Sequence, residues 1–148
     1  MTLSEQMNQA MKEAMRAKDS LRLNAIRMAK TAVTNKEKES GSSLDDQAVI
    51  AVLSSLVKQR RESAQVFRDN DRIDMAEKEE AELAVIQEFL PEPLSEEALR
   101  AMIESVVAET GATSMKEMGK VMKLVTPQTT GRADGKVVSE MVKARLAG

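Results

Sequence analysis

The chain of 148 residues contains no cysteine and no histidine. It therefore cannot form disulfides, thiolate nucleophiles, imidazole bases or a zinc site built from the usual cysteine and histidine ligands. Any catalysis would have to use hydroxyl groups, lysine, arginine or carboxylates. A serine and lysine dyad remains chemically available, but no spacing in the sequence places one. We expect no catalytic residues, no metal site and no cofactor.

Aromatic residues and long apolar runs are also scarce. Phe67 and Phe89 are the only aromatic residues, so nucleic-acid bases cannot be bound by stacking on an aromatic platform. No apolar run is long enough to cross a bilayer. The opening MTLSEQMNQAMKEAM has no basic region followed by an apolar segment, as a secretory signal would have. The sequence therefore predicts a cytoplasmic protein with no membrane partner.

Charges of the two signs nearly balance over the whole chain, with a formal net charge of -2. Their distribution is uneven, because residues 115–148 hold seven lysines and arginines against three acidic residues. A local excess of cations is typical of a region that binds a polyanion. An imbalance of this size also arises without a ligand, so charge alone does not identify one.

Apolar residues recur at helical spacing through almost the whole chain, and no segment shows the alternation typical of a strand. Capping motifs and breaks divide this pattern into seven helices. These are expected to run from Thr2 to about Lys18, from Asp19 or Ser20 to Ser40, Asp45 to Asp69, Asp71 to Leu90, Ser95 to Gly111, Ser114 to Thr126, and from Asp134 onward. The expected fold is all-α, with an N-terminal helical bundle followed by a smaller three-helix domain.

Several side chains have specific predicted positions within these helices. Met75 is expected in the core, and the charged stretch 77–82 in solvent. Pro127 is expected to end the sixth helix, because proline cannot donate the next helical hydrogen bond. Gly119 is expected to admit a closely packed neighbour, since glycine inside a helix otherwise costs about 1 kcal/mol. Gly131 is expected to adopt a positive φ before the last helix.

Two prolines within three residues, Pro91 and Pro93, interrupt the helical pattern. Proline cannot continue a helix, and it biases the preceding residue toward extended conformations. Capping signals start again at Leu94 and Ser95. We therefore expect a domain boundary here, with an N-terminal helical domain at residues 1–93 and a C-terminal helical domain at residues 94–148.

The loop before the last predicted helix has the features best suited to binding. Free N–H groups at a helix N-terminus, next to Arg132 and Lys136, suit a phosphate. Asp134 opposes this use, because a capping carboxylate accepts from the same donors and repels an anion. Lys120 and Lys123 add cations on the preceding helix. We predict that Lys120, Lys123, Arg132 and Lys136 contact a nucleic-acid backbone, which gives affinity without sequence readout.

Two other charged clusters are weaker candidates for a site. Lys58, Arg60 and Arg61 form a basic flank on an amphipathic helix, a pattern more typical of solvated surface. The glutamates within residues 77–82 point to several faces of one helix, so they cannot converge on a metal ion.

At the last two helices the chain resembles the YqeY family. The resemblance covers essentially the whole chain and depends on the run MGKVMK at residues 118–123, Pro127, the run GRADGKV at residues 131–137, Phe89-Leu90-Pro91 and Arg27-Met28. The part after the prolines is also similar to the C-terminal tail domain of GatB, the tRNA-binding subunit of the tRNA-dependent amidotransferase. Gly135 departs from that pattern, which commonly has proline after the aspartate.

The resemblance implies an all-helical protein related to glutamine-dependent carbon–nitrogen ligation, but it supplies no active site. The predicted function is a tRNA-binding or RNA-binding accessory module whose partners are tRNA and amidotransferase or translation proteins. The alternative is a helical protein-interaction module that does not bind nucleic acid. An autonomous amide-transfer enzyme is a third hypothesis, opposed by the lack of a glycine-rich nucleotide loop and of a serine-rich amidase signature.

Overall fold

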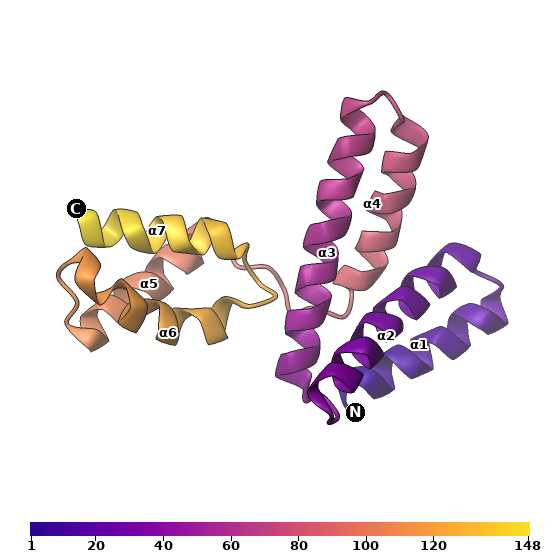
Figure 1. Cartoon of the computed structure of the whole chain (residues 1–148), viewed down its shortest axis with the longest axis horizontal. Helices are drawn as coiled ribbons and strands as arrows, with labels where there is room; N and C mark the ends of the chain where they lie inside the picture. Colours follow the sequence, from indigo (N-terminus) through magenta and orange to yellow (C-terminus); the bar gives the residue numbers. More distant parts are fainter. The chain divides into compact units, whose positions relative to one another are not determined.

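The computed structural model describes all 148 residues, and its regular structure is entirely helical (Figure 1). The helices are α1 (Leu3–Ala17), α2 (Ser20–Ser40), α3 (Asp46–Asp69), α4 (Ile73–Gln87), α5 (Glu96–Thr110), the 3-10 turn η1 (Met115–Glu117), α6 (Met118–Thr129) and α7 (Gly135–Ala147). The all-α prediction is confirmed. The chain divides into two compact units, which we call unit 1 (Met1–Leu90) and unit 2 (Pro91–Gly148).

Unit 1 consists of two helical hairpins (Figure 1). The first pairs α1 with α2, and the second pairs α3 with α4; α2 packs against both helices of the second hairpin. The tip of the α3–α4 hairpin extends away from α1 and α2. Two clusters of buried side chains hold the hairpins together, and their largest fully buried members are Met7, Ile26, Val49, Leu53 and Ile86.

The first three helices begin at the predicted caps. The side chain of Thr2 accepts from the N–H of Glu5, and the carboxylate of Glu5 accepts from the N–H of Thr2, which completes a capping box. Asp19 caps α2, and Asp45 caps α3 by accepting from the N–H of Ala48 at 2.8 Å. Each cap satisfies an amide that has no partner inside its helix.

The prediction that the fourth helix begins with Asp71 as its cap is wrong. Arg72 is the N-cap residue of α4, and no side chain caps this helix. Asp71 instead lies in the turn with a φ of 59°, and its N–H donates to the carbonyl of Arg68 at 3.1 Å. Aspartate is among the few residues that adopt this left-handed conformation readily, so it serves the turn rather than the helix.

The placement of side chains along α4 also differs from the prediction. Met75 is 40% exposed, and Ala76 takes the buried position because it shares a face with Leu83. The charged stretch 77–82 is not simply solvated. Glu82 is only 6% exposed, and the two glutamates at 79 and 80 pair with arginines of α3.

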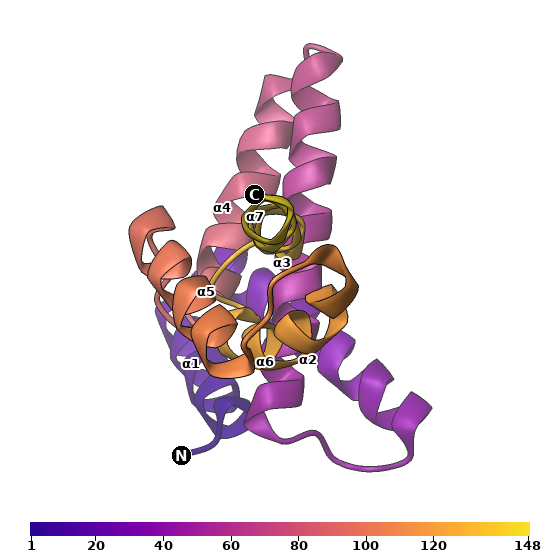
Figure 2. The same ribbon diagram turned by 90° about the vertical axis from the view of Figure 1, so that its left-hand side faces the viewer.

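Unit 2 is a three-helix unit of α5, α6 and α7 that contact one another. Figure 2 looks nearly along α7 and shows α5 and α6 on the same side of it. The core contains Leu99, Ile103, Val106, Val107, Ala112, Val121, Val125, Val138, Val142 and Leu146. Ser95 caps α5, and Gly111 ends it with a φ of 67°, both as predicted.

The sixth helix does not end at Pro127, so this prediction is wrong. Pro127 lies inside α6, which continues to Thr129. Side chains bond to backbone carbonyls around the proline: the hydroxyl of Thr130 donates to Thr126 at 2.8 Å, and the amide of Gln128 donates to Leu124 at 3.0 Å. The N–H of Thr130 also donates to Thr126 at 3.0 Å, which holds the last turn closed.

Candidate nucleic-acid interface

Lys120 and Lys123 lie on the exposed side of α6. The inward side is set by Val121, Val125 and Thr129, which are buried and recur every fourth residue. The two lysines therefore project outward, three residues apart, as neighbours on one helix surface. Neither forms an ion pair. Their ammonium groups are free to contact an anion.

Lys136 lies in the first turn of α7 beside the capping residue. The carboxylate of Asp134 accepts from the N–H of Lys136 at 2.8 Å, so the predicted cap is confirmed. This bond uses one of the free amides that a phosphate would need. The ammonium of Lys136 is exposed and has no carboxylate partner. Lys136 can therefore contact a phosphate through its side chain.

Arg132 has a structural contact that the sequence did not suggest. Its Nε donates to the backbone carbonyl of Glu92 at 3.0 Å, and its own carbonyl accepts from the N–H of Leu94 at 2.8 Å. The preceding Gly131 has a φ of 80°, as predicted, which turns the chain after α6. The side chain of Arg132 is half-buried, and its Nη groups make no hydrogen bond within the chain. Only those groups are available to a ligand.

The prediction for Gly119 is wrong. A Cβ atom placed on this glycine would meet no atom within 4 Å, so no neighbouring helix packs closely there. The residue is exposed, and it directly precedes Lys120. Its effect is to leave the backbone of the first turn of α6 uncovered beside a cation.

The exposed lysines have apolar neighbours that sequence reasoning missed. Leu124 is 40% exposed next to Lys123, and Val137 is 47% exposed next to Lys136. Val137 and Val138 are both apolar residues of the last helix, but only Val138 is buried. The exposure of one of these two valines could have been predicted from the sequence, because two successive residues of a helix point in directions about 100° apart.

Ion pairs neutralise two of the three arginines of unit 2 and none of its lysines. The unit has eight basic and eight acidic residues, so the cation excess of residues 115–148 is balanced by glutamates earlier in the same unit. Arg145 pairs with Glu104, and Arg100 pairs with Glu96 at 2.8 Å. No lysine of the unit forms an ion pair. The cations of unit 2 without an ion pair are therefore its lysines and Arg132.

One of the three cations in the basic flank of unit 1 is neutralised by an ion pair. Arg60 pairs with Glu79 at 3.1 Å. About two turns further along α3, Arg68 donates two hydrogen bonds of 2.7 Å to the carboxylate of Glu80. These bonds raise the pKa of Arg68 and lower the pKa of Glu80. Of the predicted flank, Lys58 and Arg61 remain exposed without an ion pair.

Comparison with known proteins places this two-unit helical chain in a family. Residues 4–146 match the family described as Yqey-like protein. The chain belongs to the YqeY family, so the predicted resemblance to that family is confirmed. It is 30% identical over 139 residues to the protein named "Altered inheritance of mitochondria protein 41, mitochondrial" of Lachancea thermotolerans, covering 92% of this chain and 74% of the relative.

Two further yeast relatives carry the same name. The Kluyveromyces lactis protein is 31% identical over 145 residues, or 95% of this chain and 74% of the relative. The Saccharomyces cerevisiae protein is 36% identical over 89 residues, or 59% of this chain and 48% of the relative. These names place the relatives in mitochondria, so they do not support the predicted cytoplasmic location. No helix of the chain has the length and apolar character that a membrane span requires.

Proposed function

We propose that this protein is an RNA-binding accessory module that holds tRNA through the lysines of unit 2. One observation carries the proposal: Lys120, Lys123 and Lys136 are exposed and form no ion pair, whereas in the basic flank of unit 1 Arg60 is paired with Glu79 and only Lys58 and Arg61 remain unpaired. A cation that already faces a carboxylate gains less from a phosphate than an unpaired one. The unpaired lysines therefore make unit 2 the favoured unit for a polyanion.

The chemistry of these residues fits binding to a backbone rather than reading of bases. Lysine contacts phosphate as a point charge, and such contacts carry no sequence information. The uncovered backbone at Gly119 lets a ligand approach α6 closely next to Lys120. Arg132 adds its Nη groups while its Nε stays bonded to Glu92. Selection of one RNA would therefore depend on shape or on a protein partner.

The sequence resemblance of residues 94–148 to the GatB tail adds a biological setting to the proposal. In this setting the chain assists glutamine-dependent amide transfer or translation in the cytoplasm without performing the chemistry itself. The isolated chain should release no ammonia from glutamine and should not amidate charged tRNA. Product that disappears on replacement of one serine or lysine would show instead that the chain is an enzyme.

Binding of fluorescently labelled tRNA over a series of salt concentrations tests the proposal. The dissociation constant should rise steeply with salt, because phosphate contacts release condensed counterions. Absence of binding at low salt would contradict RNA binding. Binding that does not change with salt would contradict the role given to the lysines.

A groove between α2 and α3 favours the second candidate function, a protein-interaction module. Its volume is about 540 Å³, and its apolar lining includes the half-buried Leu44, Val52 and Leu56. Lys36, Glu39 and Gln59 lie on its polar part. An apolar groove with a charged rim suits one face of an amphipathic helix from another protein.

A charge placed in the groove separates this candidate from RNA binding. Ala51→Glu should abolish cross-linking to a partner protein in cells and leave tRNA affinity unchanged. Ala101→Glu, a similarly exposed alanine on α5, is the matched control. Equal cross-linking of wild type and Ala51→Glu would exclude the groove as the contact.

A further inference from the structure

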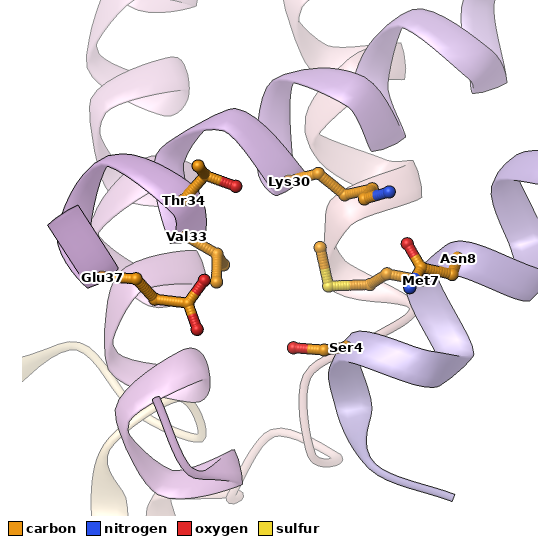
Figure 3. Close-up of a pocket in the computed structure, with 7 residues that line it drawn as sticks. All are labelled: Ser4, Met7, Asn8, Lys30, Val33, Thr34 and Glu37. Atoms are coloured by element: carbon orange, nitrogen blue, oxygen red, sulfur yellow. The ribbon is translucent and has the colours of Figure 1, made fainter. Parts of the chain in front are cut away.

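A second pocket of unit 1 lies between α1 and α2, with a volume of about 240 Å³ (Figure 3). Met7 and Val33 form its apolar base and are 1% and 5% exposed. The rest of the lining is polar. The hydroxyls of Ser4 and Thr34 and the amide of Asn8 make no hydrogen bond within the chain. A pocket lined by uncommitted polar groups over an apolar base suits a small polar molecule.

One end of this pocket carries a fixed negative charge. The Oε2 atom of Glu37 accepts from the N–H of Leu44 at 3.0 Å, which holds the half-buried carboxylate in place. No lysine or arginine pairs with it. Figure 3 shows this carboxylate and the hydroxyls of Ser4 and Thr34 directed toward the same space. Three oxygen acceptors around one space suit an ammonium group.

The other end carries a positive charge without a carboxylate partner. Lys30 is half-buried, and its ammonium donates only to the thioether sulfur of Met11, at 3.9 Å. Thioether sulfur is a weak acceptor, so this ammonium is poorly satisfied. Figure 3 shows the amide of Asn8 near the end of the lysine side chain. A carboxylate placed there would accept from both groups.

The two charges are spaced for a ligand rather than for each other. Lys30 and Glu37 are seven residues apart on α2, so their Cα atoms are separated by about 10 Å along the helix. The methyl groups of Met7 and Val33 lie between them. A molecule with one ammonium, a short apolar chain and one carboxylate would satisfy both ends and cover the apolar base.

We propose that this pocket binds a small linear zwitterion of the ω-amino-acid class. The ligand's ammonium lies at Glu37 with Ser4 and Thr34, its methylene chain lies on Met7 and Val33, and its carboxylate lies at Lys30 and Asn8. The site is formed by unit 1 alone, and it does not depend on RNA binding by unit 2.

A probe series on the unmodified full-length protein tests the proposal without any variant. 6-Aminohexanoate should bind, as measured by calorimetry and by a shift of the Met7 methyl signal in ¹³C-methionine-labelled protein. Hexanoate and hexylamine each lack one charge and should bind about tenfold more weakly, since a charge-assisted hydrogen bond is lost. Glycine should bind as weakly, because it cannot reach both ends.

Two variants assign the charges, each with a matched control. Lys30→Gln and Glu37→Gln should each weaken binding of 6-aminohexanoate by about tenfold. Lys38→Gln and Glu62→Gln remove the same charges from exposed positions outside the pocket and should leave binding unchanged. Circular dichroism of each variant verifies that it is folded.

Absence of binding by 6-aminohexanoate, or equal affinity for hexanoate and hexylamine, would overturn the proposal. So would binding that leaves the Met7 methyl signal unshifted, or that both pocket variants retain. If a pocket variant fails to fold, the probe series and the Met7 signal on the unmodified protein still decide the question.

Discussion

The Nε of Arg132 donates a hydrogen bond of 3.0 Å to the carbonyl oxygen of Glu92, forty residues earlier in the chain. The carbonyl of Arg132 in turn accepts from the N–H of Leu94 at 2.8 Å. Together these bonds join the first residues of unit 2 to the loop between α6 and α7. An arginine that the sequence suggested only as a phosphate contact therefore also holds its own unit together.

Removal of the hydrogen bond between the Arg132 side chain and the Glu92 carbonyl should destabilise unit 2. Arg132→Met is expected to lower the free energy of unfolding by about 1 kcal/mol, because the carbonyl of Glu92 loses a charged donor. Urea denaturation followed by circular dichroism measures the change. Arg100→Met, which removes an exposed pair with Glu96 on one helix, should cost less than about 0.5 kcal/mol. Equal effects of the two substitutions would refute the structural role of Arg132.

Replacement of Gly119 should stabilise the protein. Gly119→Ala is expected to add about 0.5 to 1 kcal/mol, because the new methyl group meets no atom within 4 Å and alanine favours the helix. Gly111→Ala is the control of opposite sign, since Gly111 has a φ of 67° that alanine adopts poorly. Thermal melting of both variants tests this. Destabilisation by Gly119→Ala would mean that the glycine has a role in packing after all.

The pair of Glu80 and Arg68 should make stability depend on pH in the acid range. Arg68 lowers the pKa of Glu80 in the folded protein below its ordinary value of 4.5. The pair therefore stabilises the fold above that value, and the contribution is lost as pH falls through the folded pKa. Urea midpoints of wild type and Glu80→Gln should differ at neutral pH and converge in acid. The control variant Glu62→Gln, changed at an exposed residue, should show no such pH-dependent difference from wild type. A difference between the midpoints of wild type and Glu80→Gln that persists in acid would contradict the assignment.

The boundary between domains can be tested with two fragments. The longer fragment is residues 91–148 and the shorter is residues 94–148, and both contain α5, α6 and α7. Only the longer fragment keeps the carbonyl of Glu92 that accepts from Arg132. We expect the longer fragment to fold alone and to be more stable by about 1 kcal/mol. Urea denaturation of each fragment measures the difference. If neither fragment folds, unit 2 is not an independent domain.

Local signals predicted most of the helical boundaries. Thr2, Asp19, Asp45, Ser95 and Asp134 all cap helices as expected, because capping depends on a side chain and an amide only two or three residues away. The failures have physical causes. At Pro127 the threonine and glutamine side chains around it bond the last turn, so a helix-breaking residue did not break the helix.

Contacts between distant residues were not predictable in the same way. The pairing of Arg60 with Glu79 depends on the register of α3 against α4, and no local pattern sets that register. The contact between Arg132 and Glu92 likewise spans most of unit 2. The exposed state of Lys120 and Lys123 followed from helical periodicity, but their lack of an acidic partner became visible only in three dimensions.

The salt dependence of tRNA binding, compared between two charge-matched variants, tests the central claim most directly. One variant combines Lys120→Gln, Lys123→Gln and Lys136→Gln in unit 2. The other variant combines Lys38→Gln, Lys58→Gln and Arg61→Gln in unit 1. These three residues are exposed cations without an ion pair, so this variant is the control for the change in net charge.

The logarithm of the binding constant is plotted against the logarithm of the salt concentration for wild type and both variants. If the three lysines of unit 2 contact phosphates, their removal should reduce the magnitude of the slope by about two to three, and the unit 1 variant should change it by less than about one. A larger change in the unit 1 variant, or an unchanged slope in both, would contradict the account.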